Sequence, residues 1–391
     1  MKIAFVIPWY GNIPGGAESE CRETALYLAR AGIEVEILTT CVKEFLSDWN
    51  TNYYGEGVYQ EDGIVVRRFS VRKRDTKKFD AVNFKLMHNR MVNPSEEDIF
   101  LREMIHSENL YSYITEHGED YDFLLFIPYM FGTTVSGSQI HPEKSILIPC
   151  LHNESYAHMK IYQSMFSNVG RIIYHTDEEK NIAHQIYKIG GKEYTLGEGV
   201  DTNILSDPQR FVSKYNIDAP FVLYAGRRDA GKNVDQLVKF FCQYKERHAT
   251  DLKLILIGKG FSPIPIEHQK DIIDLGFVPV QDKYDAYGAA TLFCLPSFNE
   301  SFSLVIMEAW LCLAPVLVHG RCTVTRSHCM RSNGGLYYDD YDEFEACLSF
   351  ILRNPHISDQ MAHNGRRYVI ENYGWNKIVS EYIRLFNEGI A

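Results

Sequence analysis

The feature that most constrains the fold of this chain is a strand–turn–helix–strand pattern that begins twice. The first copy opens with the continuous apolar run Ile3–Ile7 and passes through a turn rich in Gly and Pro at Gly11–Gly16. Apolar residues at helical spacing follow, Gly32 ends that helix, and Val35–Thr40 returns as a strand. The pattern predicts a β–α–β unit at the start of the chain.

The second copy begins more than two hundred residues later. Phe221–Ala225 is the strand, Gly226–Gly231 is the turn, a helical stripe starts at Val234, and Leu254–Ile257 is the next strand. Continuous apolar strands that alternate with helices are typical of parallel sheets covered on both faces. We therefore expect an α/β chain with two Rossmann-like parallel-sheet domains.

The length of 391 residues suits two domains of ordinary size. Polar residues, Asp and Pro accumulate between Gly199 and Pro208, which favours a linker there. We expect an N-terminal domain over residues 1–203 and a C-terminal domain over residues 204–372. Further short apolar strands are expected at Phe123–Ile127, Ser145–Cys150, Arg171–Tyr174, Leu292–Leu295, Pro315–Val318 and Leu336–Tyr338.

The charge balance limits the partners. Forty basic and 51 acidic side chains give a net charge of −11, which argues against general nucleic-acid binding, since that needs a surplus of Lys and Arg. No run approaches 18 apolar residues, so no membrane-spanning helix is expected. The apolar N-terminus is interpreted as the first strand and not as a signal peptide, which predicts a cytoplasmic location.

The sequence predicts no metal site. Its nine cysteines include no Cys-x-x-Cys pair, and several lie within apolar runs, which indicates buried free thiols in a reducing compartment. Asp120-Tyr121-Asp122 and Asp339-Asp340-Tyr341-Asp342 have the Asp-x-Asp spacing of some metal-binding motifs. We interpret both as turns or helix caps.

One segment departs from the acidic average. Seven cations and a single acid, Asp75, fall between Arg67 and Lys78. A run of like charges is usually a solvated face. The alternative is contact with an anionic membrane surface or an anionic acceptor.

The most specific pattern is the loop and helix Pro296–Ala309. It follows an apolar strand and carries two carboxylates, Glu300 in the loop and Glu308 inside the helix. Ligands of open α/β sheets bind at the carboxyl ends of the strands, and a helix N-terminus offers free N–H donors, here those of Phe302, Ser303 and Leu304. Two carboxylates suit the hydroxyls of a sugar and a ribose. The alternative is a helix cap at Glu300 and an exposed Glu308.

Three other sets of residues could face the same ligand. Arg227 and Lys232, in the turn after the first strand of the second domain, could hold a diphosphate, or could be ordinary surface cations. We expect the neighbouring Arg228 to be solvated. Gly15 and Gly16 permit close approach of a phosphate but do not fit G-x-G-x-x-G. His152 follows an apolar strand, at the edge where ligands bind; the alternative is a core histidine.

The frame Pro-Ser-x-x-Glu-Ser-Phe-Ser-Leu-Val-Ile-Met-Glu-Ala, which contains Glu300 and Glu308, resembles the signature of the retaining glycosyltransferases of family four, which have the GT-B fold. The resemblance covers the C-terminal half and, more loosely, the N-terminal half. It implies that the two domains face each other across a cleft, and that residues 373–391, which begin Tyr373-Gly374-Trp375, form a helix crossing back to the N-terminal domain.

The same resemblance implies roles for the candidate residues. Arg227 and Lys232 would hold the diphosphate of a sugar nucleotide and Glu308 its ribose. Glu300 and the Phe302–Leu304 amides would hold the sugar. The Gly15-Gly16 turn would lie close to the donor, and His152 would help to order the reaction centre, with Glu300 and His152 as the catalytic residues. Ser303 and Leu313 depart from positions where the family usually has Gly, and Asn153 departs from the Asp often found after the histidine.

The expected activity is metal-independent, retaining transfer of a sugar from a UDP- or GDP-sugar to a saccharide or lipid-linked acceptor, in the synthesis of a surface polysaccharide. By resemblance, the acceptor attacks on the face that the leaving phosphate occupies, and that phosphate helps to take the acceptor proton. No cofactor is expected. A nucleotide-sugar epimerase, a dehydrogenase and a catalytically silent glycosyltransferase subunit remain as alternatives; the dehydrogenase lacks its glycine motif.

Overall fold

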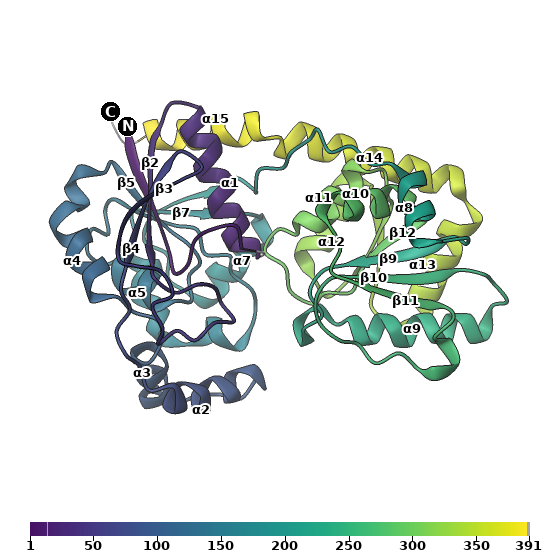
Figure 1. The fold of residues 1–391 in the computed structure, drawn as a ribbon, viewed down its shortest axis with the longest axis horizontal. Coiled ribbons are helices and arrows are strands. Elements are labelled where there is room, and N and C mark those ends of the chain that lie inside the picture. Colours follow the sequence, from purple (N-terminus) through teal and green to yellow (C-terminus); the bar gives the residue numbers. More distant parts are fainter. Residues whose placement is uncertain (14, 389–391) are drawn as a thin grey trace. The chain divides into compact units, whose positions relative to one another are not determined.

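The computed structural model describes residues 1–13 and 15–388. The chain divides into two compact units (Figure 1). The first comprises Met1–Gly199 together with the segment that begins at Ile378, and the second comprises Val200–Lys377. Each unit is built on its own sheet.

The first unit has an eight-stranded sheet in the order β3-β4-β2-β1-β5-β6-β7-β8. All neighbouring strands are parallel except β3, which pairs antiparallel with β4 at the edge. The strands are β1 (Lys2–Ile7), β2 (Glu34–Thr40), β3 (Gly57–Glu61), β4 (Ile64–Phe69), β5 (Phe123–Phe126), β6 (Ser145–Leu147), β7 (Arg171–Tyr174) and β8 (Lys192–Thr195). The parallel α/β sheet predicted for this domain is confirmed.

Helices cover both faces of this sheet, with α1 on one side and α4 on the other (Figure 1). This explains why Ile3–Val6 are fully buried, since side chains on both faces of the strand meet apolar cover. The helices are α1 (Gly16–Arg30), α2 (Thr76–Met87), α3 (Pro94–Arg102), α4 (Glu108–His117), α5 (Gly132–Gly137), α6 (Gln163–Asn168) and α7 (Asp177–Ile186).

The second unit has a six-stranded, fully parallel sheet in the order β11-β10-β9-β12-β13-β14. Its strands are β9 (Phe221–Ala225), β10 (Lys253–Ile257), β11 (Ile272–Gly276), β12 (Leu292–Leu295), β13 (Val316–His319) and β14 (Gly335–Tyr338). The central neighbours β9 and β12 both end in the loops that carry candidate residues. Parallel strands bring those two loops to one edge of the sheet.

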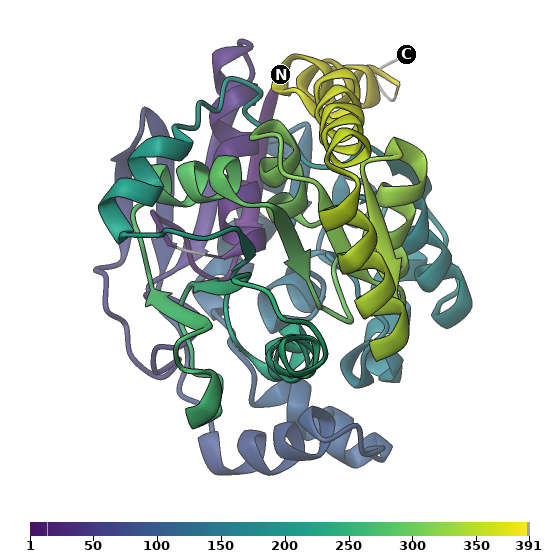
Figure 2. The same ribbon diagram turned by 90° about the vertical axis from the view of Figure 1, so that its right-hand side faces the viewer.

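Helices again lie on both sides of this second sheet, α9 on one and α10 with α11 on the other (Figure 1). They are α8 (Pro208–Tyr215), α9 (Val234–Arg247), α10 (Val280–Ala289), α11 (Leu304–Leu311), α12 (Thr323–Ser332), α13 (Tyr341–Arg353) and α14 (Pro355–Tyr373). Only Gly374 separates α14 from α15 (Trp375–Asn387), and both are yellow in Figure 2. From Ile378 on, α15 belongs to the first unit, where Phe386 stacks on Phe123 with ring centroids 5.4 Å apart.

Candidate functional site

Two loops of the second unit, after β9 and after β12, are hydrogen-bonded to each other. The backbone N–H of Phe298 donates to the carbonyl of Gly231 at 3.3 Å, and the side-chain amide of Asn233 donates to the carbonyl of Pro296 at 3.2 Å. Asn233 adopts the left-handed conformation (φ 54°), which Asn tolerates better than most residues. These bonds fix the two loops as one structure at the carboxyl edge of the sheet.

The loop pair brings together two of the predicted site residues. Lys232 Nζ lies 2.7 Å from Glu300 Oε1, and their side chains are 24% and 11% exposed. A carboxylate this far from solvent needs a countercharge or hydrogen-bond donors, and Lys232 supplies both. The Lys232 ammonium and the Glu300 carboxylate thus lie, mostly buried, at the edge of the sheet where ligands of such sheets bind.

The two neighbouring arginines of the β9 loop have opposite environments. The Arg227 side chain is 62% exposed, and its nearest acid, Asp229, lies 3.7 Å away. The expectation that Arg228 is solvated is wrong, because its side chain is only 1% exposed. Both of its terminal nitrogens contact the Asp274 carboxylate at 2.5 Å, and one also donates to the carbonyl of Gly258 at 3.0 Å. Arg228 is therefore structural, and Arg227 is the cation available to an anion.

The hydrogen bonds from Arg228 also hold the pKa of Asp274 below its ordinary value. Asp274 is the middle residue of the edge strand β11, so this pair ties the β9 loop to that edge of the sheet. Asp274 is 46 positions from Arg228 in the sequence, so no local sequence motif indicates this pair.

The N-terminus of α11 lies directly after the β12 loop. Ser303 is its N-cap residue, with φ 80° and ψ 72° and no capping bond from its side chain. Among residues 1–13 and 15–388, nothing accepts a hydrogen bond from the backbone N–H of Ser303 or Leu304. These two amides are donors of the kind that bind anions at helix N-termini. The ring of Phe302 lies in the core, with its centroid 4.8 Å from that of the Tyr373 ring.

Glu308 points from α11 toward α10 and is held there by two side chains. Both of its carboxylate oxygens lie 2.8 Å from Lys283 Nζ, and the Tyr287 hydroxyl lies 3.4 Å away. The Glu308 side chain is only 15% exposed, so the alternative of an exposed helix residue is wrong. Burial, followed by the Glu308 charge, raises the pKa of Tyr287 well above its usual value, so the phenol stays a donor.

In the first unit, Gly15 and Gly16 stand at the start of α1, with Gly15 as its N-cap residue. Gly15 has φ 179°, an extended conformation open to any residue. A Cβ at Gly15 would meet the end of the Glu18 side chain, which accepts a 2.5 Å hydrogen bond from the Trp9 indole, and a Cβ at Gly16 would meet nothing within 4 Å.

His152 lies on the segment that follows β6. Its side chain is 30% exposed, and its Nδ1 is 3.8 Å from Glu154 Oε1. The preceding residue, Leu151, is buried and donates its N–H to Glu179 at 2.6 Å. His152 is thus a half-exposed imidazole on a firmly held segment, and the alternative of a core histidine is wrong.

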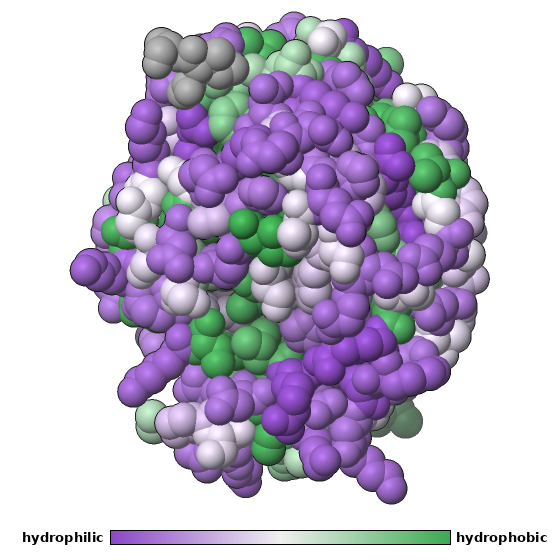
Figure 3. Space-filling model, turned by 90° about the vertical axis from the view of Figure 1, so that its left-hand side faces the viewer, coloured by the Kyte–Doolittle hydropathy of each residue, from purple (hydrophilic) through white to green (hydrophobic). Residues whose placement is uncertain are grey.

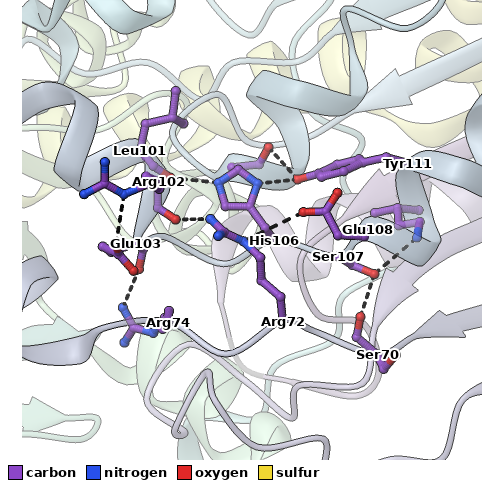
Figure 4. A network of polar contacts seen from close by, with 12 residues as sticks. Ser70, Arg72, Arg74, Leu101, Arg102, Glu103, His106, Ser107, Glu108 and Tyr111 are labelled. Atoms are coloured by element: carbon purple, nitrogen blue, oxygen red, sulfur yellow. Dashed lines mark hydrogen bonds and ion pairs between the residues drawn. The ribbon is translucent and has the colours of Figure 1, made fainter.

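Most arginines of the segment Arg67–Lys78 are used inside the first unit. Figure 4 shows Arg72 and Arg74 turned toward the end of α3, where Arg72 donates to the carbonyl of Arg102 and Arg74 to that of Glu103 at 3.0 Å. Arg67 lies 2.7 Å from Glu36. Burial would raise the pKa of Glu36, but hydrogen bonds from Arg67, Lys2 and Tyr121 lower it to about 2.

Arg68 is also buried, 2.7 Å from Glu61. The four arginines of this segment therefore mainly make contacts within the first unit, and do less to add positive charge to its surface. The face drawn in Figure 3 is mostly hydrophilic, with hydrophobic groups between the polar ones. In the described part of the chain, no helix combines the length and the apolar character needed to cross a bilayer.

The two Asp-x-Asp segments do act as a cap and a turn. Asp340 caps α13 by accepting from the Glu343 N–H, and Asp122 accepts from the Lys2 N–H at 2.7 Å. All nine cysteines are free thiols; seven are buried, and Cys150 and Cys347 are half-buried. One group that the sequence did not indicate is buried in the first unit, where Glu20, Cys150 and His175 place their polar atoms within 4.8 Å of one another.

Known structures resemble the whole chain. A sucrose-phosphate synthase from Thermosynechococcus elongatus superposes with a TM-score of 0.72 at 16% identity and covers 100% of this chain and 99% of its own. HepE of Anabaena, in complex with UDP-glucose, gives a TM-score of 0.70 at 13% identity, with 99% and 100% covered. Likeness at this identity concerns the fold, and the two parallel-sheet units define a GT-B protein.

The second unit matches a family in sequence as well. Residues 206–368 fit the family described as glycosyl transferases group 1. The D-inositol 3-phosphate glycosyltransferase of Salinispora arenicola is 28% identical over 191 residues, which cover 44% of this chain and 41% of that protein. The probable sucrose-phosphate synthase of Thermosipho melanesiensis is 24% identical over 230 residues, with 54% and 52% covered.

Residues 206–368 therefore match the glycosyl transferases group 1 family, and the chain has the GT-B fold, as its glutamate pattern predicted. It spans about two fifths of the length of the first curated relatives that it matches.

Proposed function

We propose that this chain is a retaining glycosyltransferase that moves a sugar from a UDP- or GDP-sugar to a saccharide or lipid-linked acceptor, in the synthesis of a surface polysaccharide. The observation that carries the proposal is the placement of Arg227 and of the Lys232–Glu300 pair on two hydrogen-bonded loops beside the N-terminus of α11. Two cations suit a diphosphate whose negative charge grows as the sugar leaves, and the helix amides are donors for the oxygens of the sugar. HepE, with its bound UDP-glucose, supports a UDP-sugar donor first.

In this mechanism Arg227 and Lys232 bind the diphosphate and Glu308 binds the ribose. Glu300 and the amides of Phe302, Ser303 and Leu304 hold the sugar. The bond between the anomeric carbon and the phosphate oxygen breaks, and the acceptor oxygen bonds to the same face of that carbon. The acceptor proton passes to the leaving phosphate, so the nucleoside diphosphate leaves with one more proton and no enzyme nucleophile is used.

We propose that His152 orders the reaction centre and that the Gly15-Gly16 turn lies near the donor phosphates. We also propose that transfer needs no metal, since Arg227 and Lys232 can supply the positive charge that a divalent ion supplies elsewhere. Transfer should then persist in excess EDTA. A loss in EDTA that Mg²⁺ or Mn²⁺ restores would contradict this part of the proposal.

The test of activity is direct. The protein is incubated with UDP-glucose or GDP-mannose and a panel of saccharide and polyprenyl-linked acceptors, and products are followed by mass spectrometry. Proton NMR of the product then gives the anomeric configuration. The proposal expects release of nucleoside diphosphate in step with a new glycoside of retained configuration. An inverted product would contradict retention, and epimerised sugar nucleotide without transfer would favour the epimerase.

We propose a cytoplasmic location, supported by the nine free thiols, with peripheral contact to an anionic membrane surface. Because the arginines of the basic segment are engaged internally, that contact falls to the exposed Lys73, Lys77 and Lys78. The K77E/K78E double variant should sediment less than the parent chain with phosphatidylglycerol vesicles. Equal sedimentation of the two proteins would remove the membrane from the proposal.

A further inference from the structure

The first unit contains a buried chain of charged side chains that the proposed mechanism does not use. His175, which follows β7, places Nε2 2.6 Å from Glu20 of α1 and Nδ1 3.4 Å from Glu179 of α7. All three side chains are nearly inaccessible, with exposures of 1%, 4% and 0%. Burying two carboxylates is costly without a countercharge, and an imidazolium between them supplies it.

The two carboxylates of this buried group, those of Glu20 and Glu179, both contact the short segment Cys150-Leu151. Glu179 accepts the N–H of Leu151 at 2.6 Å, and Glu20 accepts the thiol of Cys150 at 3.7 Å. Cys150 has φ 53°, an uncommon conformation for a residue other than glycine, so its backbone needs support from outside the segment. The next residue is His152. The Glu179 carboxylate also accepts the N–H of His175 at 2.6 Å, which ties the ends of β6 and β7 together.

We propose that Glu20, His175 and Glu179 form a positioning network that sets the orientation of His152 by holding Cys150 and Leu151 from two sides. The inference rests on the proposed role of His152. None of the three side chains need touch a substrate. Burial alone would lower the pKa of His175, but the two carboxylates raise it well above its usual value, which keeps the imidazole between them protonated.

A metal ion is the other way in which such a cluster could be used. However, Glu20 and His175 stand at 2.6 Å, a hydrogen-bond distance. Two ligands of one tetrahedral Zn²⁺ at about 2.0 Å each lie roughly 3.3 Å apart. The observed contact therefore fits a shared proton better than a shared ion.

The test compares E179Q and E20Q with E193Q in the full-length protein. Glu193 pairs with His184 at 2.8 Å in the same unit, so E193Q is a matched Glu–His control outside the network. The first readout is the NMR signal of the His152 ring in protein with isotope-labelled histidine, assigned through H152A. It reports orientation without requiring any activity.

The network predicts that the His152 signals move in E179Q and E20Q but not in E193Q. Hydrolysis of UDP-glucose or GDP-mannose should slow about 10- to 100-fold in kcat, with KM unchanged, as expected when a reacting group is misplaced by a fraction of an ångström. Glu179 contacts the N–H of Leu151, and Glu20 contacts the thiol of Cys150. If one of the two variants fails to fold, the other still tests the proposal.

Unmoved His152 signals in folded E179Q and E20Q would overturn the inference. One equivalent of tightly bound zinc, measured by elemental analysis, would also overturn it, because the ion would take the imidazole nitrogen that contacts Glu20. If instead the signals move but H152A leaves kcat unchanged, the network stands and the proposed role of His152 fails.

Discussion

Lys232 Nζ lies 2.7 Å from Glu300 Oε1, although the two residues belong to loops that follow different strands. The contact depends on the pairing of β9 with β12 and on the hydrogen bonds that join their loops. It places one cation and one carboxylate together at the edge of the sheet where we propose that the sugar diphosphate binds. This pair and three other features of the second unit lead to measurable predictions.

The first concerns Lys232 itself. K232M should lower kcat/KM for sugar-nucleotide hydrolysis by about 10²- to 10³-fold, roughly 3–4 kcal/mol, because a preorganised positive group at the developing charge is lost. Lys214 forms a comparable pair with Asp282, remote from these loops in the sequence, so K214M is the matched control. Equal kcat/KM values for the two variants would remove Lys232 from the site.

The second concerns the two neighbouring arginines. R227A should weaken nucleoside diphosphate binding by a few kcal/mol while leaving stability within about 0.5 kcal/mol, since its side chain is exposed. R228A should destabilise the fold by about 1–2 kcal/mol, because the buried Arg228 side chain is lost together with its hydrogen bond to Gly258 and its ion pair with the exposed Asp274. Calorimetric titration and urea unfolding measure the two effects. A reversed pattern would contradict the division of roles between these residues.

The third concerns two backbone conformations. Ser303 and Leu313 have φ values of 80° and 62°, in the region that favours glycine, and both stand where the resembling family usually has Gly. L313G should raise the free energy of unfolding by up to about 1 kcal/mol, whereas L313A keeps the Cβ and should not. Urea unfolding separates these outcomes. Equal stability of L313A and L313G would show that Leu313 costs nothing there.

The fourth concerns pH. His328 is buried against Phe302, and burial lowers its pKa from 6.5 to about 3. Between these values the unfolded chain binds a proton that the folded chain refuses, so the stability that this neutral imidazole contributes is lost as pH falls from 6.5 toward 3. The slope through this group is about 1.4 kcal/mol per pH unit.

Urea unfolding of the parent chain and H328Q at pH 7 and pH 5 tests this dependence. The stability advantage of the parent chain should shrink between the two values. An advantage that does not change with pH would mean that His328 titrates near its ordinary value in the folded chain.

Much of the fold could be predicted because β1, β9 and their following turns are local patterns. A continuous apolar strand before a Gly-rich turn has few other interpretations in an alternating chain. The edge strand β3 and its neighbour β4 were not among the expected strands. Most of β3 is exposed, and β4 carries Arg67 and Arg68, whose charges hide its apolar alternation.

The candidate site was predicted where a motif fixes the spacing, as for Glu300 and Glu308. It was not predicted where the partner comes from elsewhere in the fold. Lys283, on α10, forms an ion pair with Glu308, and Asp274, on β11, forms an ion pair with Arg228. The Glu20–His175–Glu179 network joins three elements with no common motif. Such contacts depend on strand order, which a single sequence does not display.

The measurement that tests the central claim most directly is calorimetric titration of the parent chain and R227A with UDP, GDP, ADP, dTDP and NAD, in EDTA. The account predicts that one nucleoside diphosphate binds tightly to the parent chain and at least tenfold more weakly to R227A. Preference for NAD, binding of none of the five, or equal affinity in R227A would contradict it.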